Sequence, residues 1–496
     1  MWVADDFKLH YCNVLTLQKE FAMKKFFESI KKYFCDFGES LAKGDIFTKL
    51  SLFIFGLGYM AKGQVVKGIL MTALEAIIIF FEIVLAGPYM AKLGTLGTVQ
   101  REETLDLTTL QKTVNDYDNS LLILLYGVIG VLVLIAFIFL LISNVKAVYR
   151  IQKMKENGEH VNTFSEDVRA LFNGKFYITL LTLPSIGVLL MNVIPIIFMV
   201  CIAFTNYDQN HQPPSYLFTW VGWTNFKNIM NFGAGGDFAY AFIRILAWTL
   251  IWAVLATFTT FIGGVLLAQL INHQNTKCKK MWRSLFMITI AIPQFVTLLL
   301  ISKMFGNYGI VNTFCNNIGL TDLMHKWGWV SQALDYIPFL TKPGWSHITI
   351  ILVNIWVGVP YQMLIATGIL MNIPSDQIES ARIDGANKRQ IFWKITMPYV
   401  MFVMGPSLIT SIVGNINNFN VIYLLTNGAA ATSSRFANAT AKETDLLITW
   451  LFTLTNDYSN FKMASVIGII TFIVCALITL LSYTRMISGD KEEEFQ

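Results

Sequence analysis

Long apolar runs, separated by short polar segments, make up most of the chain from about residue 69 onward. A helix needs about 20 mainly apolar residues to cross the hydrocarbon core of a bilayer. Eight segments reach that length, and we expect each to form a membrane span: 69–88, 121–142, 176–204, 246–271, 285–301, 348–371, 399–425 and 463–482. The pattern predicts an all-α, polytopic membrane protein with about eight transmembrane helices.

A shorter apolar stretch, residues 50–60, precedes the first span and is broken by Gly56 and Gly58. It is too short to cross the membrane, so we expect one helix lying in the membrane interface. Prolines interrupt several of the long spans, at positions 184, 195, 293, 360 and 406. Such breaks are tolerated where neighbouring helices or a cavity satisfy the freed backbone groups, which favours a protein with a polar passage.

Two acidic residues, Glu75 and Glu82, lie seven positions apart in the first span and therefore share one helix face. An intramembrane carboxyl group is a functional-site hypothesis by default. The alternative is that Glu75 hydrogen-bonds a neighbouring helix while Glu82 lies near the outer interface. We favour the alternative, because no other ionisable residue lies at mid-depth to continue a proton path.

The composition changes the picture by excluding several classes of protein. Only 14% of the residues are charged, against about 25% in soluble domains, so most of the surface faces something other than water. The six histidines avoid the spans, the six cysteines lack metal or redox spacing, and no G-x-x-x-x-G-K-[ST] loop occurs. We therefore expect no enzyme and no nucleic-acid partner; a membrane scaffold without transport activity stays open.

Basic residues are distributed unevenly between alternate loops. Segments 1–68, 143–175, 272–284, 372–398 and 483–496 hold 26 of the 37 lysines and arginines, and the loops between them hold 8. The other three, Arg244, Lys303 and Lys462, lie at span ends. Since cytoplasmic loops carry the excess of positive charge, we expect a plasma-membrane protein with both termini in the cytoplasm.

The N-terminal residues differ from the rest of the chain. Met23-Lys24-Lys25 reads like a bacterial start, and the codons of Lys19-Glu20 fit a purine-rich ribosome-binding site just before it. We expect Met23, not Met1, to be the natural start.

The loop between the sixth and seventh spans has a pattern of its own. Pro374 ends the preceding helix, Ser375 or Asp376 caps a new one, and Gly385 permits a turn. A second short helix is expected to carry three apolar residues and to end at a proline: Ile391, Phe392, Ile395 and Pro398. This pattern predicts a cytoplasmic helix–turn–helix whose shape suits the cleft of a partner protein.

The same loop closely resembles the signature of ABC importer permeases: Glu-Ala-Ala, three residues, Gly, nine residues, Ile, one residue, Leu-Pro. Ser380 and Met397 replace an Ala and the Leu of that signature. The resemblance implies a coupling helix in segment 374–398 that seats in a groove of a separate ATPase, where Glu379 pairs with a basic residue. The implied coupling residues are Glu379, Ala381, Asp384, Gly385, Ala386, Ile395 and Pro398.

Further motifs resemble the larger permease subunit of maltose/maltodextrin importers (MalF type) between residues 176 and 486. They are Ala203-Phe204-Thr205-Asn206-Tyr207, Trp356-Val357-Gly358-Val359-Pro360-Tyr361, Asn415-Ile416-Asn417-Asn418-Phe419 and Leu424-Leu425-Thr426-Asn427-Gly428. The large periplasmic insertion of the enterobacterial relative is absent, because residues 205–240 form a short loop, as in Gram-positive relatives.

This resemblance implies a type I ABC importer permease fold with four parts. They are a cytoplasmic segment 1–68, two accessory spans with a basic loop 69–175, a six-span core 176–486, and a tail 487–496. It also implies partners: a second, MalG-type permease, ATPase subunits that use ATP and Mg, an extracellular solute-binding lipoprotein, and membrane lipid. The chain itself is expected to hold no cofactor.

A sugar site pairs amides and hydroxyl groups with aromatic rings. Asn415 and Asn418 are three apart in the expected seventh span, on one helix face, and Tyr361 supplies a ring beside Gly358. In the maltose family the matching residues line the sugar site: Val357, Gly358, Tyr361, Ser411, Gly414, Asn415 and Asn418. Gly414 stands where that family has an aromatic residue.

Other functions of these residues and other substrates stay open. The alternative for the two asparagines is that they link helices. We expect transport of maltose or malto-oligosaccharides; the alternatives are raffinose-type or galacto-oligosaccharides, or glycerol phosphate. The late spans lack the Arg or Lys that the phosphate would need.

Overall fold

The computed structural model describes residues 24–25, 28–105, 112–233, 236–273, 275–429 and 431–487. The expected start at Met23 and most of the expected tail lie outside these residues. The chain forms two compact units, one made of residues 1–201 with 212–219 and the other of 202–211 with 220–496. Each unit is described by itself.

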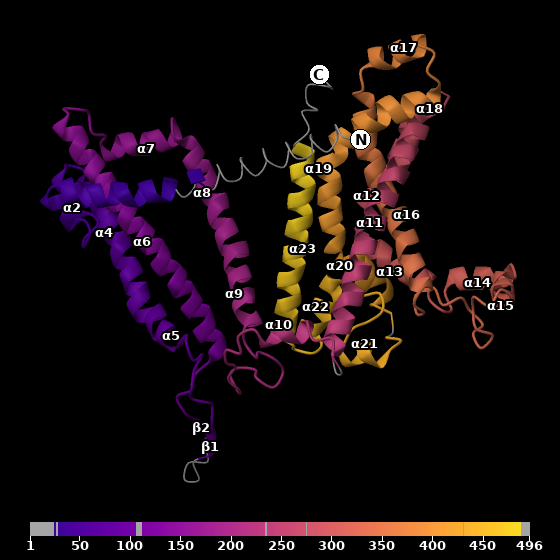
Figure 1. Ribbon diagram of the computed structural model, residues 1–496, viewed down its shortest axis with the longest axis horizontal. Coiled ribbons are helices and arrows are strands. Elements are labelled where there is room, and N and C mark those ends of the chain that lie inside the picture. The colour runs from indigo at the N-terminus through magenta and orange to yellow at the C-terminus, as the bar shows by residue number, and fades with distance from the viewer. Residues whose placement is uncertain are drawn as a thin grey trace, which may run out of the picture. The chain divides into compact units, whose positions relative to one another are not determined.

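The first unit contains three long helices, of which the first two pack against each other as a hairpin, and short helices at their ends (Figure 1). Residues 28–43 are helical and lead into α2 (Ile46–Leu50) and α3 (Leu57–Ala61). A continuous arm comes next, made of α4 (Val65–Phe80), the π-helical η1 (Phe81–Ala86) and α5 (Gly87–Lys92). An antiparallel β-ribbon of β1 (Glu103–Leu105) and β2 (Lys112–Val114) precedes α6 (Ser120–Glu156) and α7 (Phe164–Phe172). A third long helix is made of α8 (Phe176–Val188), η2 (Leu189–Val193) and α9 (Ile194–Ala203).

A close backbone approach shapes the start of this unit. A Cβ added at Gly56 would collide with the carbonyl oxygen of Gly68, so the chain before α3 lies directly against α4. The prediction of a single interfacial helix over residues 50–60 is wrong. Helix α2 ends at Leu50, a turn reaches Gly56 where the chain meets α4, and α3 begins at Leu57.

The buried Glu75 is hydrogen-bonded within the same unit. Its carboxylate accepts the backbone N–H of Phe55 at 2.8 Å, from the turn between α2 and α3. An unpaired backbone N–H inside a membrane protein is costly, so this bond ties the turn to α4. Glu75 is thus hydrogen-bonded, as the alternative expects, although its partner belongs to a turn and not to a neighbouring helix; Glu82 lies in η1.

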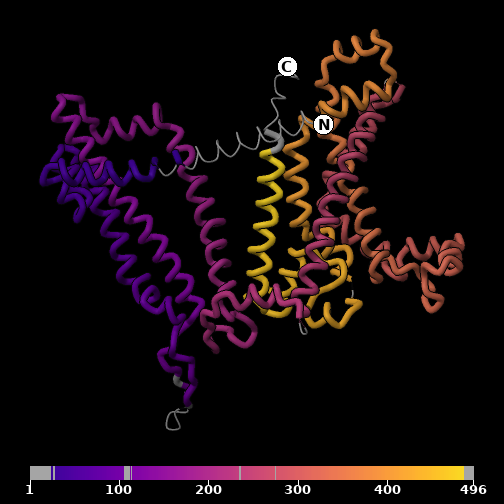
Figure 2. The backbone as a smooth tube through the Cα atoms, in the orientation of Figure 1, coloured from indigo at the N-terminus to yellow at the C-terminus, as the bar shows by residue number. Residues whose placement is uncertain are grey.

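The second unit is a helical bundle (Figures 1 and 2). Its long helices are α11 (Asp237–Asn272), α16 (Trp345–Met371), α19 (Met397–Ile416) and α23 (Phe461–Ile487). Its shorter helices are α10 (Thr224–Ile229), α12 (Lys279–Ala291), α13 (Gln294–Met304), α14 (Ile310–Asn317), α15 (Leu320–Lys326), α17 (Ser375–Ile383), α18 (Lys388–Ile391), η3 (Phe392–Thr396), α20 (Phe419–Thr426), α21 (Ser434–Asn438) and α22 (Leu447–Asn456).

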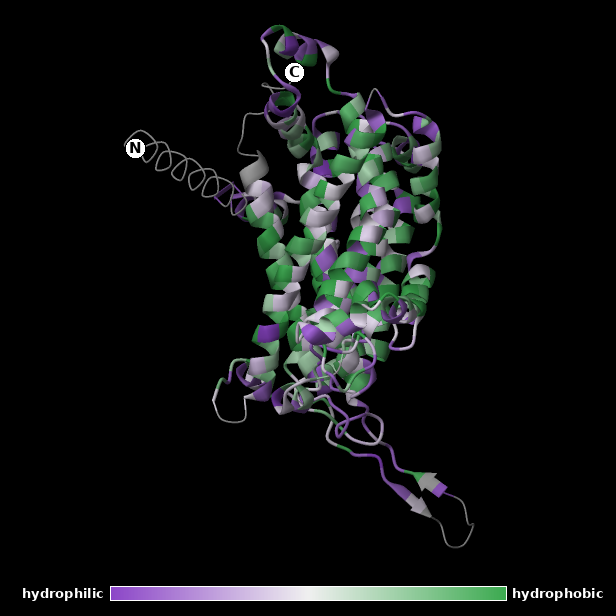
Figure 3. Cartoon of the chain, turned by 90° about the vertical axis from the view of Figure 1, so that its right-hand side faces the viewer, coloured by the Kyte–Doolittle hydropathy of each residue, from purple (hydrophilic) through white to green (hydrophobic). Residues whose placement is uncertain are grey.

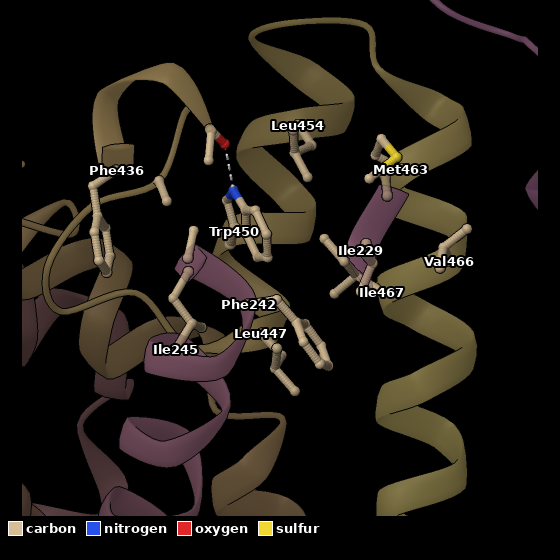
Figure 4. Close-up of a cluster of buried hydrophobic side chains, with 14 of the residues drawn as sticks. Ile229, Phe242, Ile245, Phe436, Leu447, Trp450, Leu454, Met463, Val466 and Ile467 are labelled. Carbon is tan, nitrogen blue, oxygen red and sulfur yellow. Dashed lines mark hydrogen bonds between the residues drawn. The ribbon is translucent and has the colours of Figure 1, made fainter. Parts of the chain in front are cut away.

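Helix α11 lies at the centre of this bundle and packs along α16 and α19. Near its start, buried side chains from α10, α21, α22 and α23 gather around Trp450 (Figure 4). The indole N–H of Trp450 donates to the carbonyl of Ala439 at 3.0 Å, which satisfies the one polar atom of a fully buried ring. This cluster packs the short helices α10, α21 and α22 against α11 and α23.

Hydrophobic residues cover the long helices (Figure 3), and seven of these helices are long and apolar enough to cross a membrane. The number becomes eight when α12 and α13 count as one span bent by 89°. The expected total of about eight is therefore confirmed within the described residues. Two expected spans are interrupted: 285–301 breaks at Ile292-Pro293, and 399–425 breaks after Ile416.

Candidate functional site

A cavity of about 520 Å³ opens where α12 ends, α13 begins and α16 passes its middle. Pro293 has no N–H to continue α12, and the helix restarts at Gln294 in a direction 89° away. The bend leaves space that ten residues line: Thr289, Ile290, Ile292, Pro293, Gln294, Thr297, Trp356, Val357, Gly358 and Tyr361. Three of the seven expected sugar-site residues, Val357, Gly358 and Tyr361, therefore lie together.

The α16 wall of this cavity presents aromatic rings. Trp356 is 58% exposed and Tyr361 is 54% exposed. Gly358 lies between them, and a Cβ there would come within 2.6 Å of the Thr260 side chain on α11. Gly358 is thus required for close packing of α16 on α11, in addition to any approach by a ligand.

Three polar residues on the opposite wall were not predicted as site residues. Thr289 belongs to the last turns of α12, and Gln294 and Thr297 belong to the first turns of α13. Gln294 follows Pro293 directly, so a proline inside a span with a polar residue after it was the available signal. A second cavity of about 500 Å³, almost entirely apolar, shares Ile292, Thr297 and Trp356 and extends along α13.

The two asparagines lie elsewhere in the bundle, where α19 gives way to α20. The amide of Asn415 donates to the hydroxyl of Thr257 on α11 at 3.0 Å, and its carboxamide oxygen accepts from Asn418 at 3.3 Å. Asn418 caps α20 by accepting the backbone N–H of Val421 at 3.3 Å. The backbone carbonyl of Asn415 also accepts the indole N–H of Trp252 at 3.1 Å.

The expectation that both asparagines lie on one face of a continuous helix is wrong. Asn415 is in the last turn of α19 and Asn418 is outside it, because the helix ends at Ile416. Their side chains nevertheless touch, and both serve to join helices. Ser411 and Gly414 lie on α19 as well, and a Cβ at the exposed Gly414 would meet no atom within 4 Å. None of these four residues lines the cavity beside Tyr361.

The segment expected to couple to an ATPase stands away from the bundle (Figure 1). Glu379 is exposed on α17, and Ile383, at the end of that helix, is 86% exposed. Gly385 has φ +81°, and the N–H of Ala386 then bonds back to the carbonyl of Ala381 at 2.9 Å.

The second half of this segment differs from expectation. After Asp384 and Gly385, Asn387 caps α18, and α18, η3 and α19 form one helix from Lys388 to Ile416. The expected end at Pro398 is wrong, because Pro398 lies within the first two residues of α19, where a helix tolerates it after the wide π-helical turn η3. Ile395 is half-buried in η3.

Among the residues that the structure describes, no three His, Cys, Asp or Glu side chains are placed to hold a metal ion.

Comparison with known proteins identifies the family. Residues 260–488 match the family described as the binding-protein-dependent transport system inner membrane component. The maltodextrin transport system permease protein MalC of Streptococcus pneumoniae is 32% identical over 441 residues, which are 88% of this chain and 95% of MalC. The chain belongs to the family of ABC importer permeases.

Two relatives from Bacillus subtilis extend the comparison. The maltodextrin transport system permease protein MdxF is 32% identical over 88% of this chain and 95% of MdxF. The galactooligosaccharides transport system permease protein GanP is 32% identical over 76% of this chain and 85% of GanP. Like its family, this ABC permease is a multi-span inner membrane component without enzymatic activity of its own, and the family recognised from the motifs is confirmed.

Proposed function

We propose that this permease carries maltose and malto-oligosaccharides across the plasma membrane by alternating access. The observation that carries the proposal is the cavity at the bend between α12 and α13, since it combines exposed rings with hydroxyl and amide groups. A sugar offers apolar ring faces and an array of hydroxyl groups, and such a lining matches both. The names of MalC and MdxF support maltodextrin as the substrate class.

In this proposal the site has two parts. Tyr361 and Trp356 contact sugar rings, and Gln294 and Thr297 bond hydroxyl groups across the cavity. Ser411, Gly414, Asn415 and Asn418 form the second part, on α19 and at the start of α20. A shift between two packed arrangements of the helices changes which part faces the sugar, as alternating access requires.

The partners follow from the same proposal. A MalG-type permease completes the passage, and two ATPase subunits bind ATP and Mg and dock on segment 374–398. An extracellular solute-binding lipoprotein delivers the sugar. The proposed coupling contacts are Glu379, Ala381, Asp384, Gly385, Ala386, Ile395 and Pro398. The excess of basic residues in alternate loops supports an orientation with both termini in the cytoplasm.

Uptake of labelled sugars by the assembled transporter tests this proposal. We expect uptake of maltotriose, and we expect Tyr361→Ala to lower that uptake several-fold, since a ring and a hydroxyl are both lost. Tyr308→Ala is the matched control, because Tyr308 is 83% exposed and lies outside both cavities.

The name of GanP makes galacto-oligosaccharides the second candidate substrate class. Labelled galactobiose and raffinose therefore belong in the same panel. Uptake of galactobiose without uptake of maltotriose would overturn the maltodextrin proposal and leave the permease family intact.

A further inference from the structure

An N-terminal helix crosses α6 at the level where the apolar part of α6 ends. This helix, residues 28–43, is held there by Tyr33, whose hydroxyl lies 2.7 Å from that of Ser143. The ammonium of Lys146 lies 3.9 Å from the centre of the Tyr33 ring and 3.4 Å from the Asp36 carboxylate. Since residue 142 is the last of an uninterrupted apolar run in α6, the contact with Ser143 places the helix at the edge of the hydrocarbon layer.

One side of this helix is apolar and partly exposed. Its residues Ile30, Phe34, Phe37 and Leu41 recur at helical spacing, next to the residues that contact α6; Ile30 and Phe34 are exposed, and the other two are half-buried. This apolar row continues beyond the helix through four exposed residues, Ile46, Phe47, Leu50 and Phe53. Ile46 is 70% exposed and Phe53 is 73% exposed, so no residue in the described part of the chain covers them.

The charges of the same region are unbalanced. Its acidic residues Asp36, Glu39 and Asp45 are paired with Lys146, Lys43 and Lys153, and Lys62. Among the described residues between 24 and 54, five lysines have no ion-pair partner: Lys24, Lys25, Lys31, Lys32 and Lys49. Glu28 is the acidic residue left unpaired in this segment, so a surplus of positive charge remains beside the apolar row.

We propose that segment 28–54 lies in the headgroup layer of the membrane and binds anionic phospholipids, with the apolar row in the acyl boundary and the unpaired lysines on the phosphate groups. An apolar stripe flanked by lysines is how amphipathic helices bind anionic leaflets. The expected first span, α4, also carries exposed apolar side chains, among them Ile69 (56% exposed) and Ile77 (65% exposed). The inner leaflet is the one bound if the orientation proposed above holds.

The depth of the segment is the first test. Nitroxide probes are attached at Phe34→Cys, Phe53→Cys and, as a control on the far side of the helix, Lys43→Cys, in a cysteine-free chain within the assembled transporter in lipid nanodiscs. Oxygen concentrates in lipid and a nickel chelate in water, so probes 34 and 53 should collide several-fold more with oxygen, relative to nickel, than probe 43. Equal ratios at all three sites would place the segment in water. Protection of 34 and 53 from both reagents would mean that a protein subunit covers them, and either result overturns the proposal.

The choice of lipid is the second test. The variant Lys31→Gln, Lys32→Gln, Lys49→Gln is compared with Lys227→Gln, Lys326→Gln, Lys342→Gln, which loses the same charge from other loops. Mass spectrometry counts phosphatidylglycerol and phosphatidylcholine retained from vesicles that hold equal amounts of both. A lysine near an anionic surface gives about a fivefold preference. The first variant should therefore lose phosphatidylglycerol several-fold while the second keeps it. Equal retention by both variants and the wild type would overturn the role of the lysines. Neither readout depends on the sugar transported.

Discussion

At the scale of the residue, Asn415 joins two helices, and the proposed sugar site would give it a second role. Its amide bond to Thr257 joins α19 to α11, and its oxygen receives the amide of Asn418. A carboxamide has four hydrogen-bonding positions, so these two bonds leave others for a sugar hydroxyl. Linking of helices and binding of sugar are therefore separable by the choice of substitution.

Thr257→Val removes one of the two side-chain partners of Asn415, whereas Asn415→Ala removes the whole carboxamide and both of its side-chain hydrogen bonds. Loss of one hydrogen bond typically costs about 0.5–1.5 kcal/mol. We expect both variants to lower the thermal stability of the complex, and Asn415→Ala to lower it more, because the bond to Asn418 is lost as well. Maltotriose uptake should fall about two- to tenfold further in Asn415→Ala than in Thr257→Val. Equal uptake in the two variants would leave Asn415 with a structural role alone.

Asp445 provides the second prediction at this scale. It is 2% exposed, and burial raises the pKa of its carboxyl group to about 7, although the N–H of Lys442 and the hydroxyl of Thr449 donate to it. An unfolded aspartate titrates near 3.9. Between these values the folded state holds a proton that the unfolded state has lost, so stability falls as the pH rises from about 4 to 7. We expect the melting temperature of the wild type, relative to Asp445→Asn, to fall by a few degrees over that range. A constant difference would contradict the raised pKa.

At the scale of the element, helix ends and breaks decide where the chemistry lies. Pro293 bends one span and opens a cavity, while the end of α19 at Ile416 places Asn418 at the cap of α20. Neither a proline nor an asparagine determines by itself where a helix ends. The helix that begins at Lys388, for example, continues past Pro398, because the π-helical turn η3 carries the chain into α19 without a break. The surrounding helices decide which break is kept.

The coupling segment carries the prediction for this scale. Glu379→Lys reverses a charge on the exposed face of α17 and should abolish uptake while the chain stays in the membrane, because in the proposed docking this acid pairs with a basic residue of the ATPase. Gln377→Lys adds a positive charge to the same exposed helix and is the matched control. Uptake and the ATPase activity of the purified complex are the measurements. Undiminished uptake by Glu379→Lys would rule out the coupling role of this residue.

At the scale of the whole molecule, the distribution of basic residues predicts the orientation in the membrane. The native Cys278 makes the predicted orientation directly testable, since it is exposed in the loop 272–284 expected inside the cell. An impermeant maleimide should leave Cys278 unlabelled in intact cells and label it after permeabilisation. Tyr216→Cys, in the loop 205–240 expected outside, should react in intact cells, because Tyr216 is 54% exposed. Labelling of Cys278 in intact cells would invert the proposed topology.

Much of this protein could be predicted from local sequence, since the signals act over short distances. Apolar length alone identifies the spans, because a bilayer has a fixed thickness. The turn at Gly385 was also predictable, since a left-handed φ requires glycine there. The permease family followed from motifs in the late spans and the coupling segment, and the comparisons confirm it.

Only the tertiary structure decided where side chains from distant segments meet. The partner of Asn415 is 158 positions away, and the carboxylate of Glu75 reaches the backbone of a turn 20 positions earlier. Gln294 and Tyr361 share a cavity because a bent span returns beside α16. Hydrophobic length determines that a helix crosses the membrane, but which of its faces meets another helix depends on close packing between elements, and no local pattern encodes that choice.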